Sequence, residues 1–330
     1  MSLLFTGVRL FDGRSWAPEP LDVVVDDDHV SGIGSAAPTR WTGRIEGGVV
    51  LPGLVDAHAH LALADPWQVA RAGVTGVLDL GAPLHFAIGS HEPLRYRFSG
   101  PMLTSPGGYP IRTWGAGGFG LEVATVEQAA QAASELIDHG ATVVKIALEP
   151  REGDVIPEGR LRAIVDTAHA RGVRVVAHAV LTGAVCAALD AGVDILAHVP
   201  VERLDEQVVA DIASRGVAVI STICAQGATP AVEDNARAMA EAGVRIVYGT
   251  NLGMRESPYL DIEELRCLAA VTGSEEGALR AATTDAAEVA GVSSGVHPGA
   301  PADLVWLPSF EDLADLKGPK RVWIGGREVE

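Results

Sequence analysis

Six glycine residues in the middle of the chain are each followed by a short apolar run of strand length, and this repeat limits the possible folds more than any other feature. Each run is followed by a stretch rich in Ala, Glu and Arg, which is typical of a helix. The runs follow Gly73, Gly140, Gly172, Gly192, Gly216 and Gly243. Two further apolar segments, residues 49–61 and 95–105, complete a set of eight. Eight buried strands alternating with helices predict a parallel (β/α)₈ TIM barrel over residues 50–298.

The two ends of the chain differ from this middle region. Residues 1–49 contain short stretches in which apolar and polar residues alternate between turn residues, and residues 299–330 show a similar pattern. Such alternation is typical of strands with one buried face. Because each end alone is too short for a stable sheet, we expect both termini to form one small β-sandwich domain. The predicted fold class is α/β, a barrel with a composite terminal domain.

Charge and hydropathy limit the partners. The chain has 25 basic and 43 acidic residues, a net charge of −18, so nucleic acid and anionic membrane surfaces would repel it. No apolar run reaches the roughly 20 residues of a membrane span, and the first residues lack a basic signal segment. The 3 cysteine residues are far apart and predict reduced thiols. We expect a cytoplasmic protein with a small-molecule substrate, and the apolar helices outside a barrel are compatible with a homo-oligomer.

Polar side chains recur at one position of the repeat. Four repeats carry one six positions after the glycine, at the carboxyl end of the predicted strand: Asp79, His178, His198 and Thr222. Active sites of barrels lie at that end. His58 and His60 end the first strand, and positions i and i+2 of a strand face the same side. Four histidine residues at one mouth predict a metal site, and the alternative is that these are ordinary residues at loop starts.

Lys145 lies within an apolar strand, VVKIAL, where a charge is expensive to bury. Almost all other basic residues of the chain are arginine. Unlike arginine, a buried lysine can lose its proton, and the neutral amine can react with CO₂ to form a carboxylated, bridging anion. The alternative is a lysine at the barrel end that is paired with an acid.

Several motifs together carry a family resemblance. They are LPGLVDAHAHL at the first strand, the strand lysine, the two later strand-end histidines, GTxxG at the eighth strand, and ALRAATTDAAEVAGV with HPGAPADLVWL near the end. This combination resembles the amidohydrolase superfamily, and more narrowly its imidazolonepropionase-like and prolidase-like branch. The resemblance covers nearly the whole chain, including the divided terminal domain.

The resemblance implies a binuclear metal centre. Zinc is the usual ion, one or two per chain, and five side chains would hold it: His58, His60, Lys145, His178 and His198. The first two would bind the more buried ion, Lys145 carboxylated with CO₂ would bridge, and the last two would bind the second ion. Members of the family hydrolyse a C–N bond of a small molecule through a metal-bound hydroxide. Asp56 and Asp79 match acidic positions that support the ligands.

Asn251 departs from the family pattern. The eighth strand reads YGTNLG, so Asn251 stands where the family has an aspartate that ligates the buried ion and takes the proton from the attacking hydroxide. An amide oxygen can still coordinate, but it is neutral and cannot act as a general base. Loss of this negative charge is expected to weaken the buried ion or to change the acidity of the hydroxide.

Three interpretations follow from this substitution. Hydrolysis can persist with another proton acceptor, such as His198, the carboxylated lysine or a loop acid, for which Glu256 is a candidate. The scaffold can instead catalyse a reaction that needs a Lewis acid but not that base, such as an elimination, cyclisation or isomerisation. The third interpretation is a catalytically degenerate binding protein. The full set of other ligands favours retained metal chemistry.

A long glycine-rich loop follows the third predicted strand, at residues 105–120. Loops of this length in a compact barrel often form a lid or a substrate wall. Tyr109 and Trp114 are predicted to cover an apolar substrate, and Arg112 is predicted to hold a carboxylate. The alternative for each is a structural role in capping the barrel.

Overall fold

Strands from both ends of the chain share one sheet in the computed structural model, which describes residues 2–34, 41–254 and 259–330. Strand β1 (Ser2–Leu10) pairs with β2, β4 and β5, and β5 (Val49–Pro52) pairs with β16 (Leu304–Leu307) near the other terminus. The expected pairing of the two termini is therefore confirmed. The strand order is one connected network, so two stacked layers and the domain boundaries stay predictions. The other strands of this sheet are β2 (Leu21–Asp26), β3 (His29–Ile33), β4 (Gly43–Glu46), β17 (Arg321–Ile324) and β18 (Arg327–Glu328).

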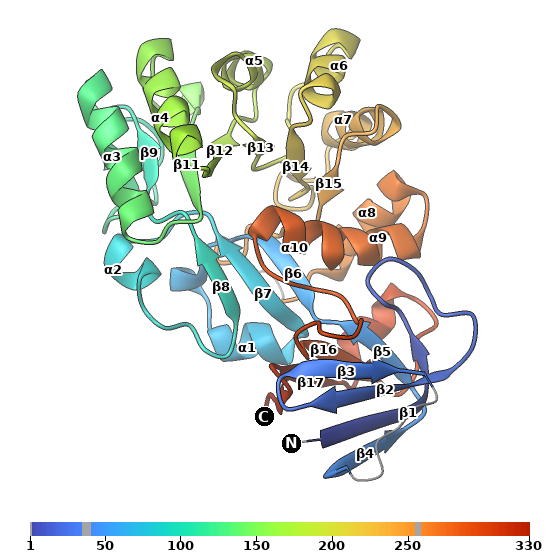
Figure 1. The fold of residues 1–330 in the computed structure, drawn as a ribbon. Coiled ribbons are helices and arrows are strands. Elements are labelled where there is room, and N and C mark those ends of the chain that lie inside the picture. Colours follow the sequence, from blue (N-terminus) through green and yellow to red (C-terminus); the bar gives the residue numbers. More distant parts are fainter. Residues whose placement is uncertain (1, 35–40, 255–258) are drawn as a thin grey trace.

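Parallel strands alternate with helices in the middle of the chain, as predicted (Figure 1). One sheet contains β6, β7 and β8, and a second runs in the order β10-β9-β11-β12-β13-β14-β15. Their bounds are β6 (Leu54–Ala59), β7 (Val74–Asp79), β8 (Arg95–Phe98), β9 (Met102–Thr104), β10 (Gly120–Glu122), β11 (Val143–Ala147), β12 (Arg174–His178), β13 (Ile195–Leu196), β14 (Ala218–Ile220) and β15 (Ile246–Val247). Backbone bonds after β15 reach β6, from Ala57 N to Tyr248 O at 3.1 Å and from Asn251 N to His58 O at 2.8 Å.

Two of the predicted strands are divided. Residues 95–105 form β8 and β9, which are separated at Gly100, whose φ of +72° is unfavourable for other residues. Since β8 pairs with β7 and β9 pairs with β11, this divided strand still connects the two parallel sheets. Residues 49–61 form β5 and β6, which are separated at Gly53, where a Cβ atom would collide with the side chain of Thr75. The first half of that predicted strand therefore belongs to the terminal sheet.

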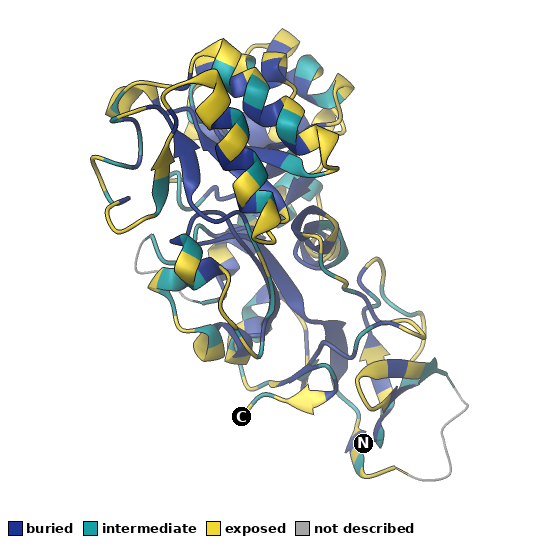
Figure 2. Ribbon diagram, turned by 60° about the vertical axis from the view of Figure 1, so that its left-hand side comes forward, coloured by how far each residue is buried: buried dark blue, intermediate teal, exposed yellow. Residues whose placement is uncertain are grey.

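The helices lie outside the parallel strands, with their exposed faces toward solvent (Figure 2). Many begin at a side-chain cap, such as Thr125, whose hydroxyl accepts from Gln128 N, or Asp205, which accepts from Val208 N. The repeat glycines that follow them have positive φ, as at Gly192 with +87°. The helices are α1 (Pro66–Arg71), α2 (Leu84–Ala87), α3 (Val126–Asp138), α4 (Glu158–Ala170), α5 (Thr182–Ala191), α6 (Glu206–Ser214), α7 (Pro230–Glu241), α8 (Ile262–Thr272), α9 (Glu275–Ala281) and α10 (Thr284–Ala290). In the described part of the chain, no helix is both long and apolar enough to cross a membrane.

Helix α10 closes the end of the strands opposite to the predicted mouth. Its buried face, which includes Ala286 and Val289, packs in one cluster with apolar side chains of the parallel strands such as Val55, Val176 and Val247. Arg174 at the start of β12 donates to the carbonyl oxygen of Val289 at 2.7 Å, which satisfies one of the last carbonyl groups of the helix. The carboxyl ends of the strands are therefore left to form the site.

Candidate active site

His58 and His60 are held by backbone carbonyl groups at the end of β6. The Nδ1 atom of His58 lies 2.9 Å from the carbonyl oxygen of Ala197, and Nδ1 of His60 lies 2.9 Å from that of Gly81. A carbonyl oxygen can only accept, so each Nδ1 donates and each Nε2 is left as the ring nitrogen that can bind a metal ion. Burial lowers the pKa of His60 to about 4 and the pKa of His58 well below its ordinary value. Both rings are therefore neutral at pH 7, the form that binds metal ions.

His178 and His198 are held by side chains instead. His198 Nδ1 lies 2.8 Å from the hydroxyl oxygen of Thr222, and His178 Nε2 lies 3.4 Å from a carboxylate oxygen of Glu149. The two remaining nitrogen atoms, His178 Nδ1 and His198 Nε2, face each other at 3.0 Å. Burial lowers the pKa of both rings. Two nitrogen ligands of one tetrahedral zinc ion lie about 3.3 Å apart, so this separation is close to that of a shared ion.

The distances between the rings show that the two histidine pairs are neighbours. The His58 ring centroid lies 4.7 Å from that of His198, and 5.3 Å from that of His60. All four side chains are buried or nearly so, with at most 9% of the residue exposed. The structure therefore gathers the four predicted histidine ligands at the carboxyl ends of β6, β12 and β13, as the repeat pattern indicated.

Lys145 is buried in the middle of β11, with 1% of its surface exposed. Burial lowers the pKa of its ammonium group to about 7, and the nearby carboxylate of Asp79 only partly opposes this shift. A large neutral fraction therefore exists at pH 7, as reaction with CO₂ requires. Within the described residues, Lys145 makes no ion pair or hydrogen bond, so the alternative of a lysine directly paired with an acid finds no support there.

Asp56 and Asp79 hold the backbone that presents these ligands. Asp56 accepts from His58 N at 2.9 Å and from the Thr250 hydroxyl at 2.6 Å. Asp79 accepts from Leu61 N at 2.9 Å and from Gly81 N at 3.0 Å, on either side of His60. Burial raises the pKa of Asp56 to about 7 and that of Asp79 to about 6, although the hydrogen bonds to each oppose this. Their contacts agree with the supporting role that the sequence suggested.

Asn251 reaches the first histidine pair. Its backbone φ is +57°, a left-handed conformation that asparagine and aspartate tolerate better than most residues. Its amide N–H donates to the carbonyl oxygen of His58, and its side chain forms a hydrogen bond with His60. The substituted position is therefore part of the site. The other candidate proton acceptor, Glu256, lies outside the described residues.

Two of the three predicted substrate residues cover the histidines. The Trp114 ring lies 5.0 Å from that of His60, and the Tyr109 ring lies 4.8 Å from that of His178. Trp114 Nε1 donates to the Tyr109 hydroxyl at 2.8 Å, so the two side chains that cover the histidines are hydrogen-bonded to each other. Burial raises the pKa of Tyr109 to about 12, so the phenol stays protonated. The guanidinium of Arg112 instead lies against Gly107 and the residue is exposed, so it is not placed with the histidines.

Glu149 is a residue of the site that the sequence pattern did not indicate. It lies just after β11, is 4% exposed, and accepts two hydrogen bonds from the Arg151 guanidinium at 2.7 and 2.8 Å. Burial raises its pKa, but the bonds from Arg151 and His178 outweigh burial and hold the pKa below its ordinary value. Its position four residues after Lys145, at a strand end, is the signal that could have found it. Thr222 is one of the strand-end polar residues of the repeat. Its φ is +41°, and its hydroxyl oxygen lies 2.8 Å from Nδ1 of His198.

The fit to divalent ions rests on the chemistry and orientation of the donors. Among the described residues, no three His, Cys, Asp or Glu side chains alone converge as a metal cage. The donor set instead combines two imidazole pairs with a lysine, which needs carboxylation to become a bridging anion. In each of the four rings, one nitrogen is held by an oxygen partner, in the way that metal-binding histidines usually are.

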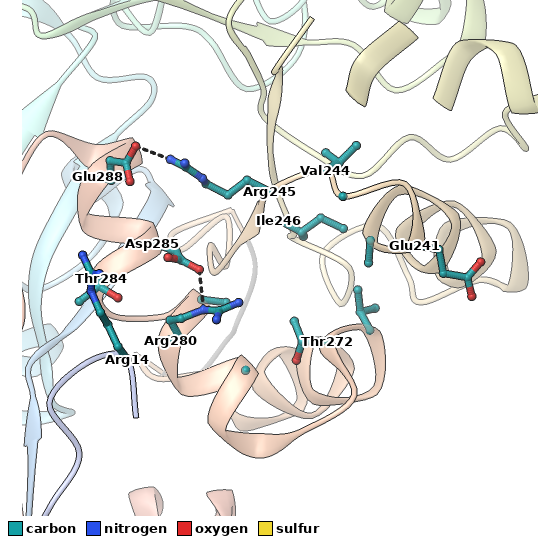
Figure 3. Close-up of a pocket in the computed structure, with 15 residues that line it drawn as sticks. Arg14, Glu241, Val244, Arg245, Ile246, Thr272, Arg280, Thr284, Asp285 and Glu288 are labelled. Carbon is teal, nitrogen blue, oxygen red and sulfur yellow. Dashed lines mark hydrogen bonds and ion pairs between the residues drawn. The ribbon is translucent and has the colours of Figure 1, made fainter. Parts of the chain in front are cut away.

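A separate cavity of about 720 Å³ lies at the opposite end of the barrel, between α7, α8, α9 and α10 (Figure 3). Its charged side chains form ion pairs with one another, Arg245 with Glu288 at 2.5 Å and Arg280 with Asp285 at 3.1 Å. These pairs join elements at the closed end of the strands. Because barrel enzymes act at the carboxyl ends of the strands, the histidine cluster and not this cavity is the candidate active site.

Comparison with known proteins agrees with this geometry. The model of the Amidohydrolase family matches residues 49–329. An uncharacterized protein of Mycobacterium tuberculosis (strain ATCC 25618 / H37Rv) is 29% identical over 301 residues, 79% of each chain. A Xaa-Pro dipeptidase with bound methionine is similar in structure, with 20% identity, 99% of both chains covered and a TM-score of 0.85. The ochratoxinase of A. niger has 20% identity, covers 99% of this chain and 95% of its own, and has a TM-score of 0.84.

The fold is that of a barrel hydrolase, and the family match extends over most of the chain. The chain belongs to the Amidohydrolase family, and with it to the enzymes that hydrolyse carbon–nitrogen bonds. The structural neighbours establish the TIM-barrel fold that the strand repeat predicted. The expected family is therefore confirmed.

Proposed function

We propose that this protein is a metal-dependent amidohydrolase that cleaves an amide or cyclic amide bond of a small molecule. One or two divalent ions, with zinc as the first candidate, would be held by five side chains: His58, His60, carboxylated Lys145, His178 and His198. The observation that carries the proposal is the orientation of His58 and His60, each donating from Nδ1 to a carbonyl and keeping Nε2 as the nitrogen for the ion, near the buried Lys145. The proposed place of the reaction is the cytoplasm, and no partner other than the substrate is required.

The chain's own residues prepare the site in three ways. When bound, the ion supplies Lewis acidity that polarises the amide carbonyl and lowers the pKa of water. Burial keeps the four imidazoles neutral, so no proton has to be displaced before they bind. Thr222 and Glu149 fix the rings of His198 and His178. Trp114 and Tyr109 lie against His60 and His178 and would shield these rings from water. Their ring faces could contact an apolar or aromatic part of the substrate.

The fate of the proton is the step that differs from the family pattern. Asn251 has no basic lone pair, so it orients His60 but takes no proton. His198 would give its Nε2 lone pair to the ion while its Nδ1 lies against the Thr222 hydroxyl, so neither ring nitrogen is left to take the proton. We therefore propose that the proton acceptor is the carboxylated Lys145 or a loop acid. Arg112 stays a candidate for the substrate carboxylate only if its loop rearranges.

The test loads the purified chain with zinc and bicarbonate and measures both metal content and hydrolysis. We expect at least about one ion per chain and release of amine from a member of a panel of N-acyl amino acids, dipeptides and cyclic amides. His60→Asn is the matched loss-of-ligand control and should fail in both measurements. Less than about half an equivalent of metal after loading would overturn the proposal and favour a binding-only protein.

A second candidate function is a metal-assisted reaction without hydrolysis, such as an elimination, cyclisation or isomerisation. The observation in its favour is the neutral Asn251 at the position of the family's base. It predicts that the native protein binds metal but hydrolyses no member of the panel, while Asn251→Asp gains hydrolysis.

A further inference from the structure

Two cysteine residues lie side by side at the edge of the site. Cys224 lies on the turn after β14, and Cys267 lies on α8, 43 positions later in the chain. Their side chains form a hydrogen bond with each other, in which the Cys224 thiol donates to the Cys267 sulfur. Both residues are half-buried and neither is in a disulfide bond. The far spacing in sequence gave no sign of this pairing.

A buried carboxylate holds the two elements in this arrangement. Glu264 of α8 is fully buried, and it accepts from Ile223 N at 2.8 Å and from Cys224 N at 2.7 Å. Cys267 lies three residues after Glu264, so both side chains are on the same face of the helix. The turn is therefore fixed to α8 close to the two cysteine side chains.

We propose that Cys224 and Cys267 are a modification site, a dithiol that glutathione disulfide oxidises to an intramolecular disulfide bond. The Cys267 thiolate attacks one sulfur of glutathione disulfide, which forms a mixed disulfide and releases one glutathione thiolate. The Cys224 sulfur, after losing its proton to water, then attacks the Cys267 sulfur and releases the second glutathione. Two protein thiols are oxidised and one disulfide molecule is reduced to two thiols, so electrons balance.

The electrostatics agree with these separate roles. The hydrogen bond from Cys224 lowers the pKa of Cys267, whereas the same hydrogen bond and burial raise the pKa of Cys224. The thiolate is the attacking form, which makes Cys267 the first nucleophile. Partial exposure leaves it accessible to a small disulfide.

The proposed bond would act on the candidate active site through the turn that carries it. Thr222, which holds His198, lies two residues before Cys224. The segment between the two cysteines contains α7, β15 and Asn251. Oxidation would therefore link the two ends of this segment covalently. It would also tie the turn that carries Thr222, the partner of His198, to α8.

The test incubates the purified full chain with glutathione disulfide and counts thiols after denaturation. We expect the count to fall from 3 to one, with a mass loss of about 2 Da and a linked peptide pair that contains Cys224 and Cys267. Cys186 lies on α5 and supplies the internal control, so Cys186→Ser should still lose two thiols. Neither Cys267→Ser nor Cys224→Ser should form a disulfide bond within the chain. Each variant should keep its thiols or lose one thiol to a glutathione adduct.

Melting temperature gives a second measurement that needs no variant. The oxidised chain should melt on the order of 5 °C higher than the reduced chain, and dithiothreitol should reverse the rise. Three thiols remaining after oxidation, a bond that involves Cys186, or a disulfide between two chains would each overturn the proposal. None of these outcomes depends on bound metal or on hydrolysis.

Discussion

The two histidine pairs at the barrel mouth are supported by different kinds of partner. His58 and His60 donate to the carbonyl oxygens of Ala197 and Gly81, which belong to the backbone. His178 and His198 depend on the side chains of Glu149 and Thr222. A backbone carbonyl is present whatever residue occupies its position, whereas a side-chain partner can be lost by one substitution.

The comparison separates what the fold supplies from what single residues supply. The backbone orients the first pair wherever the barrel forms. The variable element of this pair is Asn251, whose neutral side chain adds a hydrogen bond to His60 but no charge. The second pair can lose its orientation while the barrel is intact. Lys145 acts electrostatically on the rings of both pairs and is the group proposed to bridge them, so the predictions begin there.

Lys145→Met should have the largest effect, because it removes the group proposed to bridge both pairs. We expect the hydrolytic activity and the affinity for metal each to fall more than 100-fold. Metal analysis and the substrate panel measure this. Lys317→Met, at an exposed lysine, is the control. Normal metal content in Lys145→Met would show that neither pair needs the lysine.

The pH dependence of stability should also report on Lys145, in metal-free and CO₂-free buffer. Its folded pKa of about 7 lies below the unfolded value of 10.5, so between these pH values the unfolded chain binds the extra proton. Stability relative to Lys145→Met should therefore rise with pH above 7, by about 1.4 kcal/mol per unit, and be flat below 7. Urea unfolding at pH 6, 7, 8 and 9 checks this. A difference that stays constant from pH 7 to 9 would contradict the burial of a neutral amine.

Thr222→Val should weaken only the second pair. Valine keeps the branched shape at this positive φ but removes the hydroxyl that holds His198. We expect one step of a zinc titration to weaken about 10- to 100-fold while the other is unchanged. Calorimetry resolves the two steps. If both steps weaken equally, the two pairs do not act as separate units.

Asn251→Asp should act only on the first pair and have the smallest effect. The added negative charge beside His60 should tighten zinc about 10-fold at one step of the titration. The same variant tests the proton acceptor, since it restores the family's base. Unchanged zinc affinity at both steps would place residue 251 outside the ligand set.

Much of the fold followed from the repeat, because the glycine after each helix marks the start of the next strand. The four histidines were also predictable, since strand ends of a barrel meet at one edge. The division of strands at Gly53 and Gly100 was not, because a close contact with Thr75 and a positive φ are tertiary facts. Loop side chains were the least predictable: Trp114 and Tyr109 reached the site, whereas Arg112 did not.

Partners of the ligands were beyond the sequence for a similar reason. The strand-end position of Glu149 marks it as a candidate, but no local pattern indicates its contact with His178. The pairing of Cys224 with Cys267 likewise depends on which elements lie side by side. Asn251 was identified only because the family pattern has a metal-binding aspartate at its position. Its hydrogen bond to His60 agrees with a place in the site.

The place of two late segments has a consequence for how the chain folds during synthesis. β16 completes the sheet begun by β1 and β5, and α10 fills the closed end of strands that were made long before it. A nascent chain that has left the ribosome up to residue 280 therefore has all its barrel strands but an open apolar interior. Docking of α10 and pairing of β16 with β5 are therefore late steps, which must follow the synthesis of residues 284–307.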